Sequence, residues 1–207
     1  MSRFLHSLLP SRKSVHLVGL SARGAAWLAS SATGAPHWQQ AAWETCLSAS
    51  NISIALKSVM DLLDPSPAQG IAWVLAPSLV RSWVQFPSPQ IASLSELQAV
   101  AQARASQLFG EPVCAAAPGV PWAVTADWQA GRPFLCMTSP FVWVQSLQAL
   151  SQGGKNGQIL SPLMLALEHF KQQIPASGWL AMAVAGELSI SHWTGGRISR
   201  NLLLEIL

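Results

Sequence analysis

The sequence predicts the α/β fold class, with a mixed β-sheet flanked by helices. Short runs with alternating or continuous apolar residues, typical of strands, recur along the 207 residues. They are interspersed with longer segments that have helical apolar spacing and recognisable caps. Half of the residues are hydrophobic and only three are Cys, which excludes a disordered chain and a disulfide scaffold.

The first predicted elements form a β-hairpin. Val15–Ser21 (VHLVGLS) is rich in aliphatic residues and predicts a strand. A second strand is expected over residues 25–31, after a turn in which Gly24 supplies conformational freedom. Because the connection is short, the two strands should be antiparallel. Residues 37–47 are a candidate third strand, with less regular apolar spacing.

Two helices and two strands are predicted next. Residues 50–63 form a helix, capped by Ser50 or Asn51 and ended by prolines. Its expected apolar side consists of Ile54, Leu56, Val59, Met60 and Leu63. The continuous apolar run over residues 71–76 is typical of a central buried strand, and residues 79–86 alternate as a further strand. Residues 93–109 form the second helix, with a capping box at Ser93 and Glu96 and with Gly110 at its end.

The C-terminal half combines hairpins with two helices. One hairpin is expected over residues 123–128 and 133–138, and another over residues 179–184 and 187–192. The helices are expected over residues 141–150 and 160–173. Gly195 and Gly196 then turn the chain into a last strand, residues 197–204.

Charge and hydropathy narrow the possible partners. Only 10% of the residues are charged, against about 25% in ordinary soluble domains, and the formal net charge is +3 without a dense basic stripe. Nucleic acid is therefore not an expected partner. The mean hydropathy is +0.32, but every apolar stretch is too short or too interrupted to cross a bilayer, so no direct membrane insertion is expected. Because no signal peptide is recognised either, a cytoplasmic location is expected. The surplus apolar surface predicts a protein partner.

No motif for catalysis, metal or cofactor binding is found. The chain has no phosphate-binding GxxxxGK[ST] or GxGxxG motif, no HExxH and no GxSxG. The lysine-containing glycine run at residues 153–157 is interpreted as a loop between helices. The three cysteines, Cys46, Cys114 and Cys136, are too widely spaced for a zinc site. We therefore assign no catalytic residue, no metal ligand and no cofactor, although dispersed acids leave a carboxylate dyad open.

Tryptophan is the most unusual feature of the composition, with ten residues and no Tyr. Seven of them lie mostly in or beside predicted strands: Trp73, Trp83, Trp122, Trp128, Trp143, Trp179 and Trp193. Packing in the core would explain them. The alternative is an exposed Trp that anchors a partner protein, since Trp is enriched at interface hot spots.

Several segments, taken in order, carry a resemblance. They are the opening LVGLSARGAAWLA, then LVRSWVQFP and QLFGEP, then LSPLMLALEHF, and last WLAMAVAGELSISHWTGGRISRNLLL. This order resembles the actin-like ATPase superfamily, in the PilM/GspL-like branch of type IV pilus and type II secretion assembly proteins. The resemblance implies an N-terminal segment over residues 1–14 and an actin-like (ribonuclease H-like) first lobe over residues 15–160. Residues 161–207 would form a connecting helix and the start of a second lobe.

The two hairpins differ from those of the active members of this superfamily. Active ATPases of this superfamily carry an acid and adjacent glycines in both hairpins, which hold magnesium and phosphate. Here the first hairpin reads VGLS over residues 18–21 and the second reads AVAG over residues 183–186, each without an acid. Magnesium would lack its anchor at both places. The resemblance therefore implies a role that involves no catalysis.

The leading hypothesis is a non-catalytic cytoplasmic scaffold or adaptor of a type IV pilus or type II secretion-like assembly. It would bind a protein partner, such as an inner-membrane component, and would reach that membrane only through the partner. The last strand is a candidate for pairing with a peptide. The candidate partner-binding residues are Trp193, Arg197, Ser199 and Asn201.

Three alternatives stay open at this point. The first is a degenerate nucleotide-binding protein of the same superfamily, supported only by the hairpin glycines. The second is an enzyme whose site is assembled from residues distant in sequence. The third is a small α/β domain with another binding role, such as a regulator of a filament-forming protein.

Overall fold

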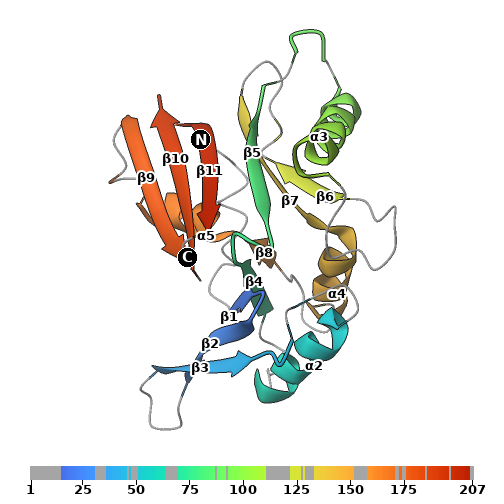
Figure 1. The fold of residues 1–207 in the computed structure, drawn as a ribbon, viewed down its shortest axis with the longest axis vertical. Helices are drawn as coiled ribbons and strands as arrows, with labels where there is room; N and C mark the ends of the chain where they lie inside the picture. The colour runs from blue at the N-terminus through green and yellow to red at the C-terminus, as the bar shows by residue number, and fades with distance from the viewer. Residues whose placement is uncertain are drawn as a thin grey trace.

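Three β-sheets and the helices around them form the framework of the described part of the chain (Figure 1). The fold is described from a computed structural model. It describes residues 15–30, 36–45, 47, 51–63, 70–86, 88–91, 93–110, 122–126, 128, 133–151, 158–170, 173, 176–184, 186–195 and 197–205.

The first sheet has five strands in the order β3-β2-β1-β4-β8. Its strands are β1 Val15–Ser21, β2 Gly24–Ser30, β3 Pro36–Ala42, β4 Gly70–Leu75 and β8 Gln158–Leu160. The strands β1, β2 and β3 form an antiparallel meander, while β4 pairs in parallel with both β1 and β8. The predicted mixed sheet, the first hairpin and the central strand are therefore confirmed.

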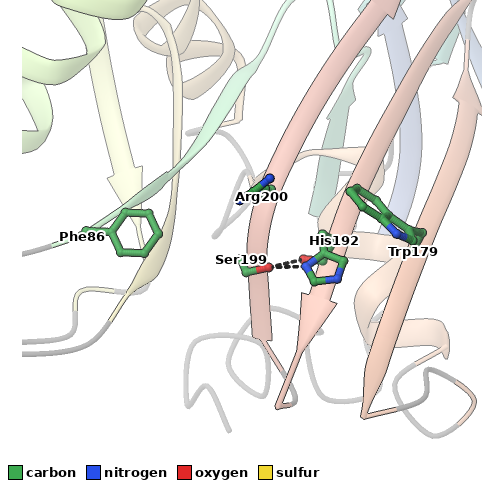
Figure 2. Close-up of a pocket in the computed structure, with 5 residues that line it drawn as sticks. All are labelled: Phe86, Trp179, His192, Ser199 and Arg200. Atoms are coloured by element: carbon green, nitrogen blue, oxygen red, sulfur yellow. Dashed lines mark hydrogen bonds between the residues drawn. The ribbon is translucent and has the colours of Figure 1, made fainter.

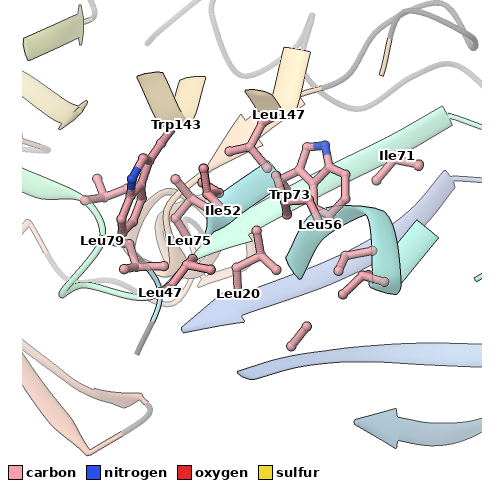
Figure 3. Close-up of a cluster of buried hydrophobic side chains, with 14 of the residues drawn as sticks. Leu20, Leu47, Ile52, Leu56, Ile71, Trp73, Leu75, Leu79, Trp143 and Leu147 are labelled. Carbon is pink, nitrogen blue, oxygen red and sulfur yellow. The ribbon is translucent and has the colours of Figure 1, made fainter. Parts of the chain in front are cut away.

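The main core lies between this sheet and two helices, α2 (Ile52–Leu63) and α4 (Phe141–Ser151). Figure 3 shows Trp73 of β4 among aliphatic side chains of both helices, including Leu56 and Leu147. All three of these side chains are fully buried. The predicted apolar side of α2 is wrong at one position, because Ile54 is 71% exposed while Ile52 is buried in its place.

Gly24 is required for a different reason from the one that the sequence indicates. It is the first residue of β2, and a Cβ atom there would lie 2.4 Å from the carbonyl oxygen of Ala41 in β3. Neighbouring backbone therefore approaches too closely for any side chain.

Gly24→Ala is expected to lower the free energy of unfolding by about 2 kcal/mol, because the backbone of β3 must move away. Urea unfolding followed by circular dichroism measures this change. Gly19→Ala is the matched control in the same hairpin, since its Cβ would lie 3.5 Å from the nearest atom, an ordinary contact. Equal effects of the two substitutions would contradict the explanation.

The second sheet, β5-β7-β6, carries helix α3 on one side. Its elements are β5 Arg81–Gln85, α3 Leu94–Phe109, β6 Trp122–Ala126 and β7 Phe134–Pro140. The capping box of α3 is confirmed: the Ser93 side chain accepts from the Glu96 N–H and the Glu96 carboxylate accepts from the Ser93 N–H. Gly110 ends the helix with a φ of 68°.

Aromatic side chains fill the core of this second sheet. The Phe109 ring lies edge-on to both Trp83 and Trp122, with centroid distances of 5.8 and 6.1 Å. Cys136 is fully buried beside them, and burial raises the pKa of its thiol to about 12. The thiol therefore stays protonated near neutral pH and acts as a small apolar group.

The third sheet is an antiparallel meander, β9 Ser177–Val184, β10 Glu187–Thr194 and β11 Arg197–Glu205. Helix α5 (Pro162–Phe170) precedes it. In Figure 1, β11 lies on the side of this sheet that faces β5, and β9 forms the outer side. The predicted second hairpin and last strand are confirmed.

One predicted helix start is wrong, and some other predictions fall on residues that the structure does not describe. The prediction of a helix that begins at Leu160 is wrong. Leu160 ends the short strand β8, and the helix α5 begins at Pro162. The expected boundary between residues 160 and 161 falls between β8 and α5, and the division into lobes stays a prediction. The N-terminal segment 1–14 and the loop 153–157 lie outside the described residues. Among the described helices, none has the length and apolar character that a membrane span requires.

Candidate partner-binding surface

One face of the third sheet is largely apolar and open. Cross-strand register places three rows of side chains on this face, each taking one residue from β9, β10 and β11. We call it the open face: Trp179, His192 and Arg200; Ala181, Ile190 and Leu202; Ala183, Leu188 and Leu204. Trp179, Leu202 and Leu204 are half or more exposed, at 64%, 56% and 50%. Large apolar side chains so exposed on one face are typical of an interaction surface.

A β-bulge shapes one end of the open face. His192 pairs with Arg200 and the next residue, Trp193, pairs with Ile198, so Ser199 is an extra residue in β11. Its hydroxyl lies 2.6 Å from Nδ1 of His192 (Figure 2). The imidazole ring in turn lies against the Trp179 ring, with a centroid distance of 4.6 Å. The bulge thereby orients His192 and Trp179 on the surface.

A pocket of about 490 Å³ opens at this end of the face. Its lining residues are Phe86, Trp179, His192, Ser199 and Arg200. Figure 2 shows Phe86, which directly follows β5, on the far side of β11 from Trp179. Phe86 is 64% exposed, and the Arg200 side chain is also exposed. The pocket combines apolar rings with one cationic group, which suits a protein segment that presents an apolar and an acidic side chain.

The opposite face of the sheet is joined to the rest of the molecule by Asn201. Its Oδ1 accepts hydrogen bonds from the hydroxyls of Ser189 and Ser191, at 3.2 and 2.7 Å. Its Nδ2 donates to the hydroxyl of Ser82 in β5, at 2.8 Å. Ser189 and Ser191 are both buried, so this network fixes β10 and β11 against the second sheet.

The four candidate residues from the sequence therefore do not form one group. Ser199 lies in the pocket, whereas Asn201 points to the opposite face and holds the sheet in place. Trp193 is half-buried and pairs with Ile198, which is buried. The side chain of Arg197 lies outside the described residues. Their role in partner binding stays a prediction.

Sequence reasoning missed Phe86, Arg200, Leu202 and Leu204 as members of this surface. Leu202 and Leu204 belong to the continuous run LLL at residues 202–204 of β11, which lacks the alternation that would indicate one exposed face. Both faces of this strand carry leucines, so the pattern does not tell which face is open. Of the seven tryptophans discussed above, Trp73, Trp83, Trp122 and Trp143 are buried and Trp179 is exposed.

Residues at the two hairpin turns make hydrogen bonds to other parts of the chain. At the first turn, the carbonyl oxygens of Ala22 and Arg23 accept from the N–H groups of Leu47 and Trp43. At the second turn, the first acid is Glu187, and its Oε2 accepts the N–H of Ser78 at 2.6 Å. This carboxylate therefore bridges β10 to the segment after β4.

The side chains that could bind a metal ion are dispersed in the described parts of the chain. No group of three or more His, Cys, Asp or Glu side chains lies close enough there to hold an ion.

Comparison with known proteins identifies the fold. No protein-family model matches the chain, and no curated protein matches it. Solved structures do match. The cytoplasmic domain of EpsL, an inner-membrane component of the type II secretion system of Vibrio cholerae, aligns with a TM-score of 0.55 and 15% identity. The alignment covers 92% of this chain and 71% of that domain.

Two further solved structures have a similar fold. A Bacteroides thetaiotaomicron protein with an actin-like ATPase fold and unknown function aligns over 100% of this chain and 74% of its own, with a TM-score of 0.56 and 12% identity. The PilM-PilN type IV pilus biogenesis complex contains a chain that aligns with a TM-score of 0.53 and 13% identity. That match covers 94% of this chain and 62% of the other. This chain therefore has the actin-like ATPase fold.

Proposed function

We propose that this protein is a non-catalytic adaptor of a pilus-type or type II secretion-type assembly, and that it binds a partner protein through the open face. The observation that carries this proposal is the exposure of Trp179, Leu202 and Leu204 on one sheet face, beside the pocket that holds Arg200. Exposed Trp and Arg are the residues most often found at the energetic centre of protein interfaces. We place the protein in the cytoplasm, next to the inner membrane through its partner.

The chemistry of the two hairpins supports a role without catalysis. The acid nearest the second turn, Glu187, is bound to the backbone of Ser78. At the first turn, the Ser21 hydroxyl accepts from the N–H of Arg23. A nucleotide with magnesium would have to displace these contacts and would find no free carboxylate at either turn. The similarity in fold between this protein and both PilM and the EpsL cytoplasmic domain supports a role in a pilus or secretion assembly.

The test uses the cytoplasmic segments of inner-membrane proteins encoded beside this chain, each titrated into the purified protein by calorimetry. We expect one segment to bind, and Trp179→Ala to weaken its binding by about thirtyfold, which corresponds to about 2 kcal/mol. Trp38→Ala is the matched control, because Trp38 is 72% exposed but lies on β3 of the first sheet. Absence of binding to every segment, or sensitivity to Trp38 alone, would overturn the proposal.

Nucleotide binding is tested in the same preparation. Addition of about 5 mM ATP with magnesium is expected to leave the Tm unchanged, because only a ligand that binds the folded state raises it. A rise of several degrees, or ATP hydrolysis that co-purifies with the protein, would favour the degenerate nucleotide-binding protein instead.

A further inference from the structure

We propose that the exposed side of helix α2 is a self-association surface, on which two copies of this chain pair with their α2 helices antiparallel. The inference goes beyond the adaptor function proposed above and does not depend on it. Helix α2 packs against the first sheet, whereas the open face belongs to the third sheet. Figure 1 shows α2 at the periphery of the molecule, away from the third sheet.

Helix α2 exposes two large apolar side chains. Ile54 is 71% exposed and Leu62 is 59% exposed, while the opposite side of the helix is buried in the main core. The two residues are eight positions apart, so they lie on one stripe along the helix, with Ser58 midway between them. The outer side of a helix that covers a sheet is usually polar, so an apolar stripe there indicates a contact surface.

Ser58, in the middle of this stripe, is suited to a point where two helices cross. Its side chain is small, so a second helix can approach closely there. Its hydroxyl already donates a hydrogen bond to the backbone carbonyl oxygen of Ile54, at 3.2 Å. Burial of the hydroxyl under a second helix would therefore leave no unpaired donor.

The charges of α2 identify a second copy of the chain as the occupant. The charged residues of this helix are Lys57 and Asp61, which are both exposed and lie next to the apolar stripe. Neither forms an ion pair with any residue that the structure describes. A complementary surface would offer an acid to Lys57, a base to Asp61 and apolar groups to the stripe. The α2 helix of a second copy offers all three.

Antiparallel pairing brings these groups together twice. When a two-fold axis passes close to Ser58, Lys57 of each copy lies beside Asp61 of the other, and Ile54 of each copy lies beside Leu62 of the other. Parallel pairing in register would instead place like charges side by side, which is unfavourable. The order of the two charges along the helix therefore selects the antiparallel arrangement.

The dimer is expected to be weak. A single pair of short helices buries less than the roughly 1,200 Å² of a standard interface, so we expect a Kd on the order of 100 µM. Sedimentation equilibrium between about 5 and 500 µM protein should show a monomer at the low end and a growing fraction of dimer at the high end. Over the same range, NMR amide signals of the exposed side of α2 should shift and those of the open face should not.

A substitution in the apolar stripe tests the surface. Ile54→Asn is expected to weaken dimerisation about tenfold, because it removes the apolar contact with Leu62 of the second copy at both ends of the helix pair. The far-UV circular dichroism of the monomer should be unchanged, since Ile54 is exposed. Leu94→Asn is the matched control, because Leu94 is 53% exposed but lies on α3. Equal weakening by both substitutions would contradict the assignment to α2.

Exchange of the two charges tests the geometry. In Lys57→Glu two acids would face each other at each contact, and in Asp61→Lys two bases would do so. Each variant alone is expected to dimerise about tenfold more weakly. A mixture of the two variants should form a heterodimer about as tightly as the original protein, because each contact then joins opposite charges. In-register parallel helices would place two lysines at one of these positions and two acids at the other in the original protein, which would itself pair poorly.

Each outcome supports or overturns the inference. A monomer at about 500 µM, a dimer that is insensitive to Ile54→Asn, or a mixture of charge variants that does not associate would each overturn the α2 pair. Shifts of α2 signals that occur only when a partner segment is added would also overturn it, because the occupant would then be the partner. The adaptor function is tested separately by Trp179→Ala, so either inference can fail while the other stands.

Discussion

Replacement of Trp73 by alanine is expected to lower the free energy of unfolding by about 3–5 kcal/mol, the range for loss of a large buried side chain. Trp73 lies on β4, the central strand that pairs in parallel with both β1 and β8, and its side chain is fully buried. It packs between the first sheet and helices α2 and α4 (Figure 3). Deletion of the indole would leave a cavity at the point where all these elements meet.

Chemical unfolding in urea, followed by far-UV circular dichroism, measures the effect. Trp73→Phe gives a milder reference in case the alanine variant does not fold, with an expected loss of about 1–2 kcal/mol. Trp38→Ala is the matched control, because it deletes the same side chain where it is 72% exposed. A loss below about 1 kcal/mol for Trp73→Ala would show that this tryptophan does not hold the core together.

Asn201→Ala is expected to lower the free energy of unfolding by about 2–3 kcal/mol. The substitution removes the acceptor of the two serine hydroxyls on β10 and the donor to Ser82 on β5. Ser191 is 2% exposed, so its hydroxyl would lose a partner that water cannot readily replace. The third sheet would then detach more easily from the second.

Ser199→Ala is the matched control for this network. Its hydroxyl bonds to His192 at the partly exposed pocket, so its loss should cost less than about 1 kcal/mol. Ser199→Ala is instead expected to weaken partner binding, through the lost orientation of His192. If Asn201→Ala left stability unchanged and abolished partner binding, Asn201 would belong to the interface, as the sequence first indicated.

Local chemistry was sufficient to predict most of the secondary structure. The capping box at Ser93 and Glu96 fixes the start of α3 because both contacts form within one turn of the helix. The apolar run of β4 predicted a buried central strand because a strand covered on both faces has no polar side. Predictions failed where packing against other elements determines which side chains are buried. Ile54 is an example, because its exposure depends on how α2 is rotated against the sheet.

The candidate site was predicted only in part. The sequence leaves open whether Trp179 is buried in the core or exposed to a partner. The structure shows that it is exposed. Ser199 and Asn201 are two residues apart, so in a regular strand they would share a face. The bulge opposite His192 places them on opposite sides, and such a bulge depends on pairing with a distant strand.

The sequence by itself determined the fold class, the order of the strands and helices apart from the short strand β8, and the absence of acids from residues 18–21 and 183–186 of the two hairpins. These properties follow from residue types and spacings along a few consecutive turns or strands. Only the tertiary structure decided that Glu187 is bound to Ser78 and that Asn201 faces inward. Each of these depends on contacts between residues far apart in the chain, whose pairing is set by the packing of whole sheets and not by local preference.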